Sequence, residues 1–252
     1  MPEPRRHFHE QLQDLERGIQ DMGVAAQDLF DLSLRALLDR DRALCDKVIA
    51  GDDAVDAYYL DIERGIMDLF ALQTPVASDL RLLTALLHVE VHLERVADMA
   101  VNIAKIVKVS CGLPSNARVV EHLEEMGGLA LQMLAAAMDA FDRRDLTLCR
   151  RLTTMDDPID RLNRGMLAEV LDGASDKAML EWGIAMHVVS REIERVGDHA
   201  VDIGEQVAFL ITGEFMEFTD ASHPELEHPG GAVRSSYLRG VEMGGQRPAA
   251  GP

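Results

Sequence analysis

Two segments of this chain, 100 residues apart, have nearly the same sequence. ERVADMAVNIAK covers Glu94–Lys105, and ERVGDHAVDIGE covers Glu194–Glu205. A second matched pair recurs at an offset of 104 residues: RDRALCDKVIAGDDAVD at Arg40–Asp56 and RDLTLCRRLTTMDDPID at Arg144–Asp160. Because both pairs keep their order and nearly the same spacing, the sequence indicates a tandem duplication. The fold must therefore be built from two similar units.

Composition and helix punctuation indicate that each unit is helical. Hydrophobic residues make up 47% of the chain and aromatic residues only 4%, a mixture that favours packed helices over sheets. Helix boundaries are expected at Pro75, at a cap formed by Ser78-Asp79, at Gly112–Pro114, at a helix start near Pro158, at Gly173 and at Gly213. These boundaries predict three helices before residue 112 and three after it, each of roughly 25–35 residues.

We therefore predict an all-α protein made of two tandem three-helix bundles. The first repeat is assigned to residues 1–112, the second to 113–215 and a tail to 216–252. From Ser222 onward the chain holds six glycines and four prolines, with few large apolar residues, so we expect a flexible tail.

The net charge indicates which partners the chain can bind, and its apolar runs indicate where it is located. A formal net charge of −19 disfavours nucleic acid and anionic membrane surfaces, and favours cations and basic protein surfaces. No uncharged apolar run reaches the roughly 18 residues of a membrane span, and the N-terminus shows no apolar signal core. We expect a cytoplasmic protein that does not insert into the membrane. The three cysteines, Cys45, Cys111 and Cys149, are expected to be reduced, buried thiols.

The last helix of each unit carries a column of polar side chains opposite its buried stripe. Leu93, Val96 and Ala100 step by three and four residues, as expected for a face packed on a core. The opposite face holds Glu94, Asp98 and Asn102 in the first unit, and Glu194, Asp198 and Asp202 in the second. Residues four apart lie about 5–6 Å apart at Cβ, so like charges in the column repel. Salt bridges to Arg95 and Arg195, together with solvent, are one way to offset that repulsion.

A second acidic group begins the middle helix of each unit, DDAVD at Asp52–Asp56 and DDPID at Asp156–Asp160. If the middle helix starts near residue 42, Asp56 lies about 20 Å along it. Asp98 then lies at a similar height on a neighbouring helix that ends near residue 110. We expect the two groups to meet on an outer face, with no matching Lys or Arg. Convergent carboxylates of this kind suit hard cations such as Mg, Mn, Ca or Fe.

The candidate metal ligands are therefore eight polar residues, four from each unit. They are Asp56, Glu94, Asp98 and Asn102 in the first unit, and Asp160, Glu194, Asp198 and Asp202 in the second.

Other candidate sites have weaker signals. His88 and His92 are spaced to bind zinc from one helix, but the second unit lacks both, so surface or packing histidines are favoured. His199 replaces Met99 in the second copy, where it could neighbour a metal, although an exposed histidine is favoured. The sequence has neither a phosphate-binding glycine loop nor a nucleophile elbow. Its one Glu-x-x-His spacing, Glu225–His228, lies in the tail.

The doubled pattern Glu-Arg-Val-x-Asp-x-Ala-Val-x-Ile, ending each three-helix unit, resembles the PhoU family of cytoplasmic regulators of phosphate uptake and signalling. The resemblance covers roughly residues 8–215. It implies two three-helix bundles, a homodimer, and metal binding by the acidic motifs Glu94–Asp98 and Glu194–Asp198. Asn102 and Asp202 occupy the next turn and suggest that the two metal sites are unequal. The implied partners are the ATPase subunit of the phosphate ABC transporter and the phosphate-sensing histidine kinase.

We therefore expect a non-enzymatic negative regulator of phosphate uptake and phosphate-starvation signalling that acts by docking on other proteins. Its cofactors would be divalent or trivalent metal ions, Mg, Mn or Fe. Two alternatives from other classes stay open. One is a metal-dependent hydrolase whose clustered cations activate water. The other is a structural helical adaptor whose acidic residues are solvated.

Overall fold

The computed structural model describes residues 3–218, which form six helices and no strand. The helices are α1 (Glu3–Asp39), α2 (Arg42–Leu72), α3 (Ser78–Ser110), α4 (Ala117–Arg143), α5 (Leu146–Gly173) and α6 (Lys177–Thr212). The predicted all-α class is confirmed, with three helices before residue 112 and three after it. The tail from Ser222 onward, including Glu225–His228, lies outside the described residues.

Short polar side chains set most of the helix starts. Asp41 and Asp145, which are equivalent in the duplication, accept hydrogen bonds from the first backbone N–H groups of α2 and α5. Asn116 and Asp176 cap α4 and α6 in the same way. Gly213 follows α6 with a φ of 76°, a left-handed conformation that glycine adopts without strain and that ends the helix as expected.

Two predicted boundaries are wrong. Ser78 and Asp79 do not cap α3, because the residue before the helix is Ala77 and no side chain there bonds the helix end. Pro158 lies inside α5 rather than near a helix start. A proline at this position removes the backbone hydrogen bond to the carbonyl of Thr154. Since Thr154 is exposed, water can satisfy that carbonyl and the helix continues.

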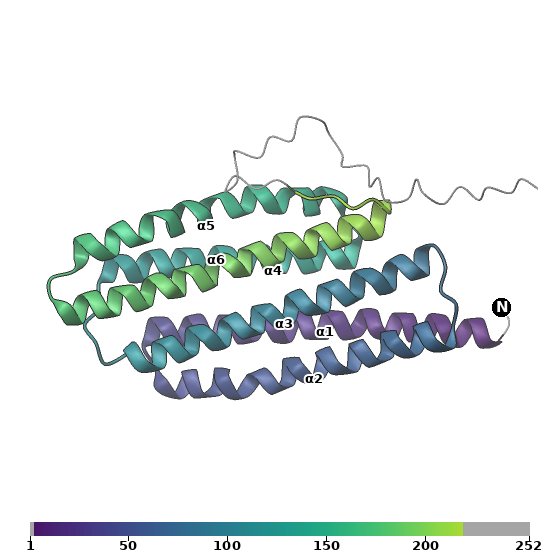
Figure 1. Cartoon of the computed structure of the whole chain (residues 1–252), viewed down its shortest axis with the longest axis horizontal. Helices are drawn as coiled ribbons and strands as arrows, with labels where there is room; N and C mark the ends of the chain where they lie inside the picture. Colours follow the sequence, from purple (N-terminus) through teal and green to yellow (C-terminus); the bar gives the residue numbers. More distant parts are fainter. Residues whose placement is uncertain (1–2, 219–252) are drawn as a thin grey trace, which may run out of the picture.

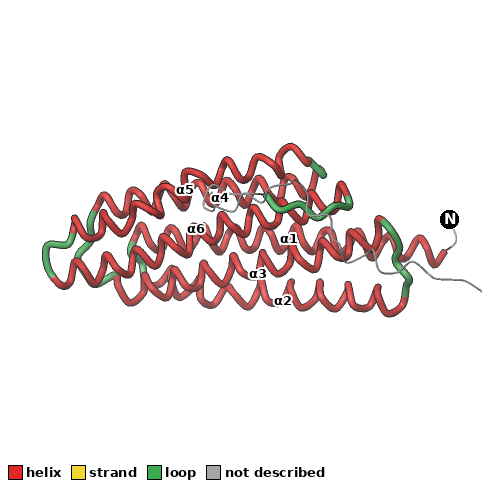
Figure 2. The backbone as a smooth tube through the Cα atoms, turned by 45° about the horizontal axis from the view of Figure 1, so that its top comes forward, coloured by secondary structure: helices red, strands yellow, loops and turns green. Residues whose placement is uncertain are grey.

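The six helices form two bundles that pack side by side (Figure 1). One bundle contains α1, α2 and α3, and the other contains α4, α5 and α6, with all six running along the long axis of the molecule (Figure 2). Across the junction α3 contacts α6 and α1 contacts α4, whereas α2 and α5 contact only helices of their own bundle. Buried side chains from both bundles belong to one hydrophobic core.

Cysteine burial differs from the prediction at one position. Cys45 and Cys149 are buried, but Cys111 is partly exposed and its Sγ accepts a hydrogen bond of 2.8 Å from Arg42 Nε. All three thiols are free. Within residues 3–218, no helix is both long enough and apolar enough to cross a bilayer. The first residues of the assigned tail are described: Met216 and Phe218 pack against the core.

Candidate functional site

The two acidic groups of the first repeat meet between α2 and α3, as predicted. We call Asp52, Asp56, Glu94 and Asp98 the first acidic cluster. Partial burial and then the charges of Asp56 and Asp98 raise the pKa of Asp52. Partial burial and then Asp98 raise the pKa of Glu94, with a smaller contribution from Asp56. Carboxylates from two helices therefore influence one another directly.

The first acidic cluster is open to solvent and partly neutralised. Asp53 and Asp56 are exposed, and the side chain of Asp98 is 45% exposed. Arg95 Nη1 lies 3.2 Å from Asp98 Oδ2, and Arg95 Nε lies 3.5 Å from Glu94 Oε2. The salt bridge considered from the sequence is therefore present here. Asn102, one turn beyond Asp98, is partly buried.

The corresponding residues of the second repeat lie in a pocket of about 660 Å³ between α5 and α6. We call Asp156, Asp160, Glu194, Asp198 and Asp202 the second acidic cluster. The first two are almost fully buried, at 2% and 4% exposure. The prediction that these acids lie on an outer face is therefore wrong for Asp156 and Asp160, whereas the side chain of Asp202 is 43% exposed.

Two features that the duplication does not share enclose the second acidic cluster. The first repeat has Ala97 where the second has Gly197, and a methyl group added to Gly197 would lie 2.7 Å from Asp156 Oδ1. The absence of a side chain there lets the acidic face of α5 approach α6 closely. The chain after α6 then returns over the pocket, where Glu217 and Phe218 line it and the backbone N–H of Phe218 donates to Glu205 Oε1.

Negative charge is in excess in this pocket. Seven carboxylates and three guanidinium groups line it. Arg164 Nη1 lies 3.3 Å from Asp160 Oδ2, and Arg191 Nη1 lies 3.5 Å from Glu194 Oε1. The prediction of acids without matching arginines is therefore wrong. Arg195, expected beside Asp198, pairs with Glu192 instead, at 3.4 Å.

The pKa values reflect this excess. Burial, followed by the charges of Glu194 and Asp160, raises the pKa of Asp198 to about 6. Burial is also the main cause that raises the pKa of Glu205 to about 7. Partly buried carboxylates that repel one another are stabilised by a cation, and their oxygen atoms are the ligands that Mg²⁺, Mn²⁺ and Ca²⁺ prefer. The donor set of the second acidic cluster therefore fits a hard cation.

Sequence reasoning missed two residues of this pocket and one contact between the repeats. Glu205 and Glu217 line the pocket, although neither belongs to the repeated acidic motifs. His92 was considered only with His88, one turn away on α3. In the structure His92 Nδ1 lies 3.0 Å from His199 Nδ1 across the junction between α3 and α6. His199 is mostly buried rather than exposed, with 18% of its side chain accessible. Only the packing of one repeat on the other reveals this contact.

Comparison with known proteins assigns the chain to a family. The family model for the PhoU domain matches residues 19–107 and 123–207. A phosphate-specific transport system accessory protein PhoU homolog from Rhizobium meliloti is 33% identical over 210 residues, covering 82% of this chain and 87% of that protein. A PhoU homolog from Methanothermobacter thermautotrophicus is 30% identical over 212 residues, covering 84% and 97%. The crystal structure of PhoU from Pseudomonas aeruginosa matches with a TM-score of 0.76 at 27% identity, covering 82% of this chain and 99% of that one. This chain belongs to the PhoU family.

Proposed function

We propose that this protein is a non-enzymatic accessory protein of a phosphate-specific transport system, acting in the cytoplasm as a negative regulator of phosphate uptake and phosphate-starvation signalling. The observation that carries the proposal is the match along most of the chain to relatives named as accessory proteins of that system. The duplicated acidic clusters supply the surfaces through which it would act. Its partners are the ATPase subunit of the transporter and the phosphate-sensing histidine kinase, and it acts as a homodimer.

The mechanism we propose is docking that favours one conformation of the partner. A protein that binds one state of a transporter or kinase more tightly than the other shifts the population toward the bound state. The strongly acidic chain, with its net charge of −19, is complementary to basic partner surfaces. High phosphate would favour the complex that restrains uptake and keeps the kinase inactive.

Metal ions belong to this proposal. Asp56, Glu94, Asp98 and Asn102 would hold a cation in the first repeat, and Asp160, Glu194, Asp198 and Asp202 would hold one in the second. Mg, Mn or Fe ions suit the oxygen donors. A bound cation supplies positive charge that offsets the repulsion between carboxylates. In each repeat the acidic side chains would hold the middle helix and the last helix together through that ion.

Capture of partners tests the docking proposal. The tagged protein is recovered from phosphate-replete and phosphate-starved cells, and the retained proteins are identified by mass spectrometry. We expect the transporter ATPase or the sensor kinase to be retained, and in larger amount from replete cells. Retention of neither protein under both conditions would refute the docking partners named here.

Elemental analysis tests the metal proposal separately. The protein is purified without chelator, and bound metal is counted for wild type, Asp98→Ala and Asp198→Ala. Each variant should lose metal while its helicity stays unchanged, and chelator should lower the melting temperature until Mn²⁺ or Mg²⁺ is restored. Asp53→Ala, an exposed acid beside the first acidic cluster, is the matched control and should keep its metal. Full metal content in both test variants would refute this site. Metal-free wild type would favour a structural adaptor with solvated acids.

A metal-dependent hydrolase is the second candidate, because the second acidic cluster is concave and partly buried. Pockets of that kind can hold a substrate beside clustered cations. The discriminating measurement is phosphatase activity across several divalent metals, with Asp198→Ala as the control. Turnover in the wild type that is lost in this variant would favour the hydrolase. Equal background rates in both proteins favour the regulator.

A further inference from the structure

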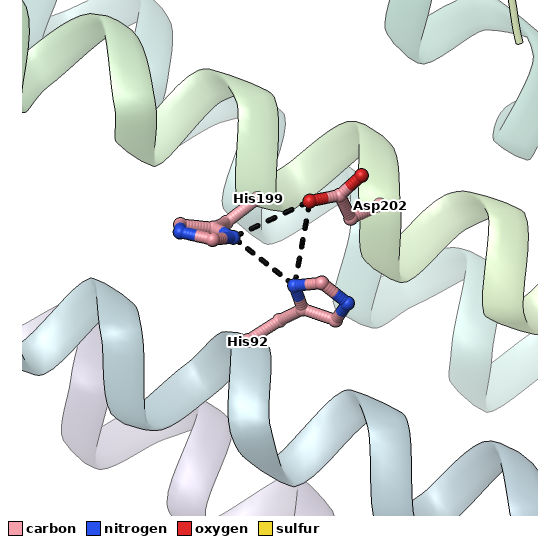
Figure 3. A group of neighbouring side chains, drawn as sticks. All are labelled: His92, His199 and Asp202. Atoms are coloured by element: carbon pink, nitrogen blue, oxygen red, sulfur yellow. Dashed lines mark hydrogen bonds and ion pairs between the residues drawn. The ribbon is translucent and has the colours of Figure 1, made fainter.

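Three side chains from the two repeats converge at the junction between the bundles. His92 extends from α3, and His199 and Asp202 extend from α6 (Figure 3). His92 Nδ1 lies 3.0 Å from His199 Nδ1, and Asp202 Oδ2 lies 3.4 Å from each of these nitrogen atoms. Three potential ligand atoms therefore form a nearly equilateral triangle.

The dimensions of this triangle match one face of a tetrahedral metal site. With Zn–N and Zn–O bonds of about 2.0–2.1 Å, tetrahedral ligand atoms are separated by about 3.3 Å. The observed separations of 3.0, 3.4 and 3.4 Å bracket that value. The spacing of the three atoms therefore fits a single ion. We propose that His92, His199 and Asp202 bind a divalent ion of the zinc class, with a fourth position open to water or to a ligand from a partner.

The site shares Asp202 with the second acidic cluster, but each of its three ligands differs from the residue at the equivalent position of the other repeat. At the offset of 100 residues, His199 stands where the first repeat has Met99, and Asp202 where it has Asn102. His92 corresponds to Glu192. None of the three equivalent positions in the other repeat carries a histidine. The three departures meet at one point in space, although His92 lies on α3, 107 residues before His199 on α6.

Burial differs among the three ligands. The two histidine side chains are 19% and 18% exposed, whereas Asp202 is 43% exposed. The nitrogen atoms are thus shielded from bulk water, and the carboxylate side gives an ion a route from solvent.

Ligand type separates this site from the two acidic clusters. Imidazole nitrogen suits Zn²⁺, Cu²⁺, Ni²⁺ and Fe²⁺, whereas carboxylate oxygen alone suits Mg²⁺ and Mn²⁺. A zinc-class ion here would join α3 to α6 and fix how one bundle packs on the other. The competing arrangement has no metal. In it, the Nδ1–H of one histidine donates a hydrogen bond to the Nδ1 of the other and to Asp202 Oδ2.

The test uses the full-length protein after chelator treatment. Co²⁺ is the probe, because it replaces Zn²⁺ and absorbs visible light strongly in tetrahedral sites. We expect one equivalent of Co²⁺ to produce that absorption and one equivalent of Zn²⁺ to abolish it. His92→Gln and His199→Gln should each weaken Co²⁺ binding by about 100-fold or more, since even changes to outer-shell partners of a metal site cost 10–100-fold.

A matched control makes the result specific. His88→Gln alters an exposed histidine one turn from His92 on the same helix. It should bind Co²⁺ as the wild type does, and circular dichroism checks that every variant is folded. Absence of the absorption from folded wild type, or equal binding by the His92 and His88 variants, would overturn the proposal. Neither result would bear on the partner-capture experiment.

Discussion

At the scale of single residues, the least expected side chain is Glu90 on α3. It is 1% exposed, and its Oε2 has no hydrogen-bond partner among the residues that the structure describes. Burial, followed by the charge of Glu63, raises the pKa of Glu90 to about 8. The equivalent residue of the second repeat is Ser190, whose Oγ lies 3.0 Å from Asn163 Oδ1. The first repeat therefore buries a carboxylic acid, neutral at pH 7, where the second buries a hydrogen-bonded hydroxyl.

This acid makes stability depend on pH. The unfolded carboxyl titrates near its ordinary value of 4.5, so the folded state binds more protons between about pH 4.5 and 8. Stability contributed by the neutral acid is therefore lost as pH rises through that window. In metal-free protein, the free energy of unfolding of wild type should fall by roughly 2 kcal/mol more than that of Glu90→Gln between pH 6 and pH 8, at 1.36 kcal/mol per pKa unit. Urea denaturation at the two pH values measures the difference.

Glu124→Gln, at an exposed site on α4, is the control. Its free energy of unfolding should change between the two pH values as that of the wild type does. All other titrating groups are the same in wild type and Glu90→Gln, so the comparison isolates Glu90. If the two proteins lose the same free energy of unfolding between pH 6 and pH 8, Glu90 is already ionised in the folded state.

At the scale of helices, periodicity predicted which helix faces are buried but not how closely neighbouring helices pack. The end of α3 at Ser110 was predicted from the Gly112–Pro114 signal, and the start of α2 at Arg42 agrees with the assumed start near residue 42. These two bounds bring the first acidic cluster together. The enclosure of the second acidic cluster depends on Gly197, whose role emerges only once α5 is packed against it. The triangle of His92, His199 and Asp202 needs the register of α3 on α6, which no local pattern encodes.

Gly197→Ala tests whether close helix packing buries the second acidic cluster. The added methyl group would meet Asp156 Oδ1 at 2.7 Å, so α5 and α6 must separate or the carboxylate must move. We expect a loss of about 1–3 kcal/mol, typical of overpacking, together with weaker cation binding in the second repeat. Chemical denaturation and metal titration measure the two effects.

The control is Gly165→Ala, at an exposed position of α5 where an added methyl group meets no atom within 4 Å. Alanine there should stabilise the protein by up to about 1 kcal/mol, because glycine is the poorer helix former. A Gly197→Ala variant that is stabilised like the control would contradict this prediction. It would show that the added methyl group does not force α5 and α6 apart.

At the scale of the whole molecule, the two repeats share a core although they arose by duplication. Side chains of α1 and α4 interlock where glycine leaves room. A methyl group on Gly127 would lie 2.6 Å from a methyl carbon of Leu34, and one on Gly23 would lie 2.6 Å from a methyl carbon of Met138. Arg144, which follows α4, pairs with Glu16 of α1. A boundary near residue 112 in the chain is therefore not a boundary in the core.

A shared core predicts that the repeats unfold together. Trp182, the one tryptophan of the chain, is buried in α6 and reports on the second repeat, whereas far-ultraviolet circular dichroism reports on all helices. We expect the two signals to give coincident urea transitions with one midpoint, as for a two-state protein. Leu34→Ala removes packing at the junction from the side of the first repeat. It should lower stability by about 2–5 kcal/mol and shift both signals equally, because the loss is transmitted to the second repeat. Two separate transitions, or a shift in circular dichroism that leaves Trp182 fluorescence unchanged, would mean that each bundle is stable on its own.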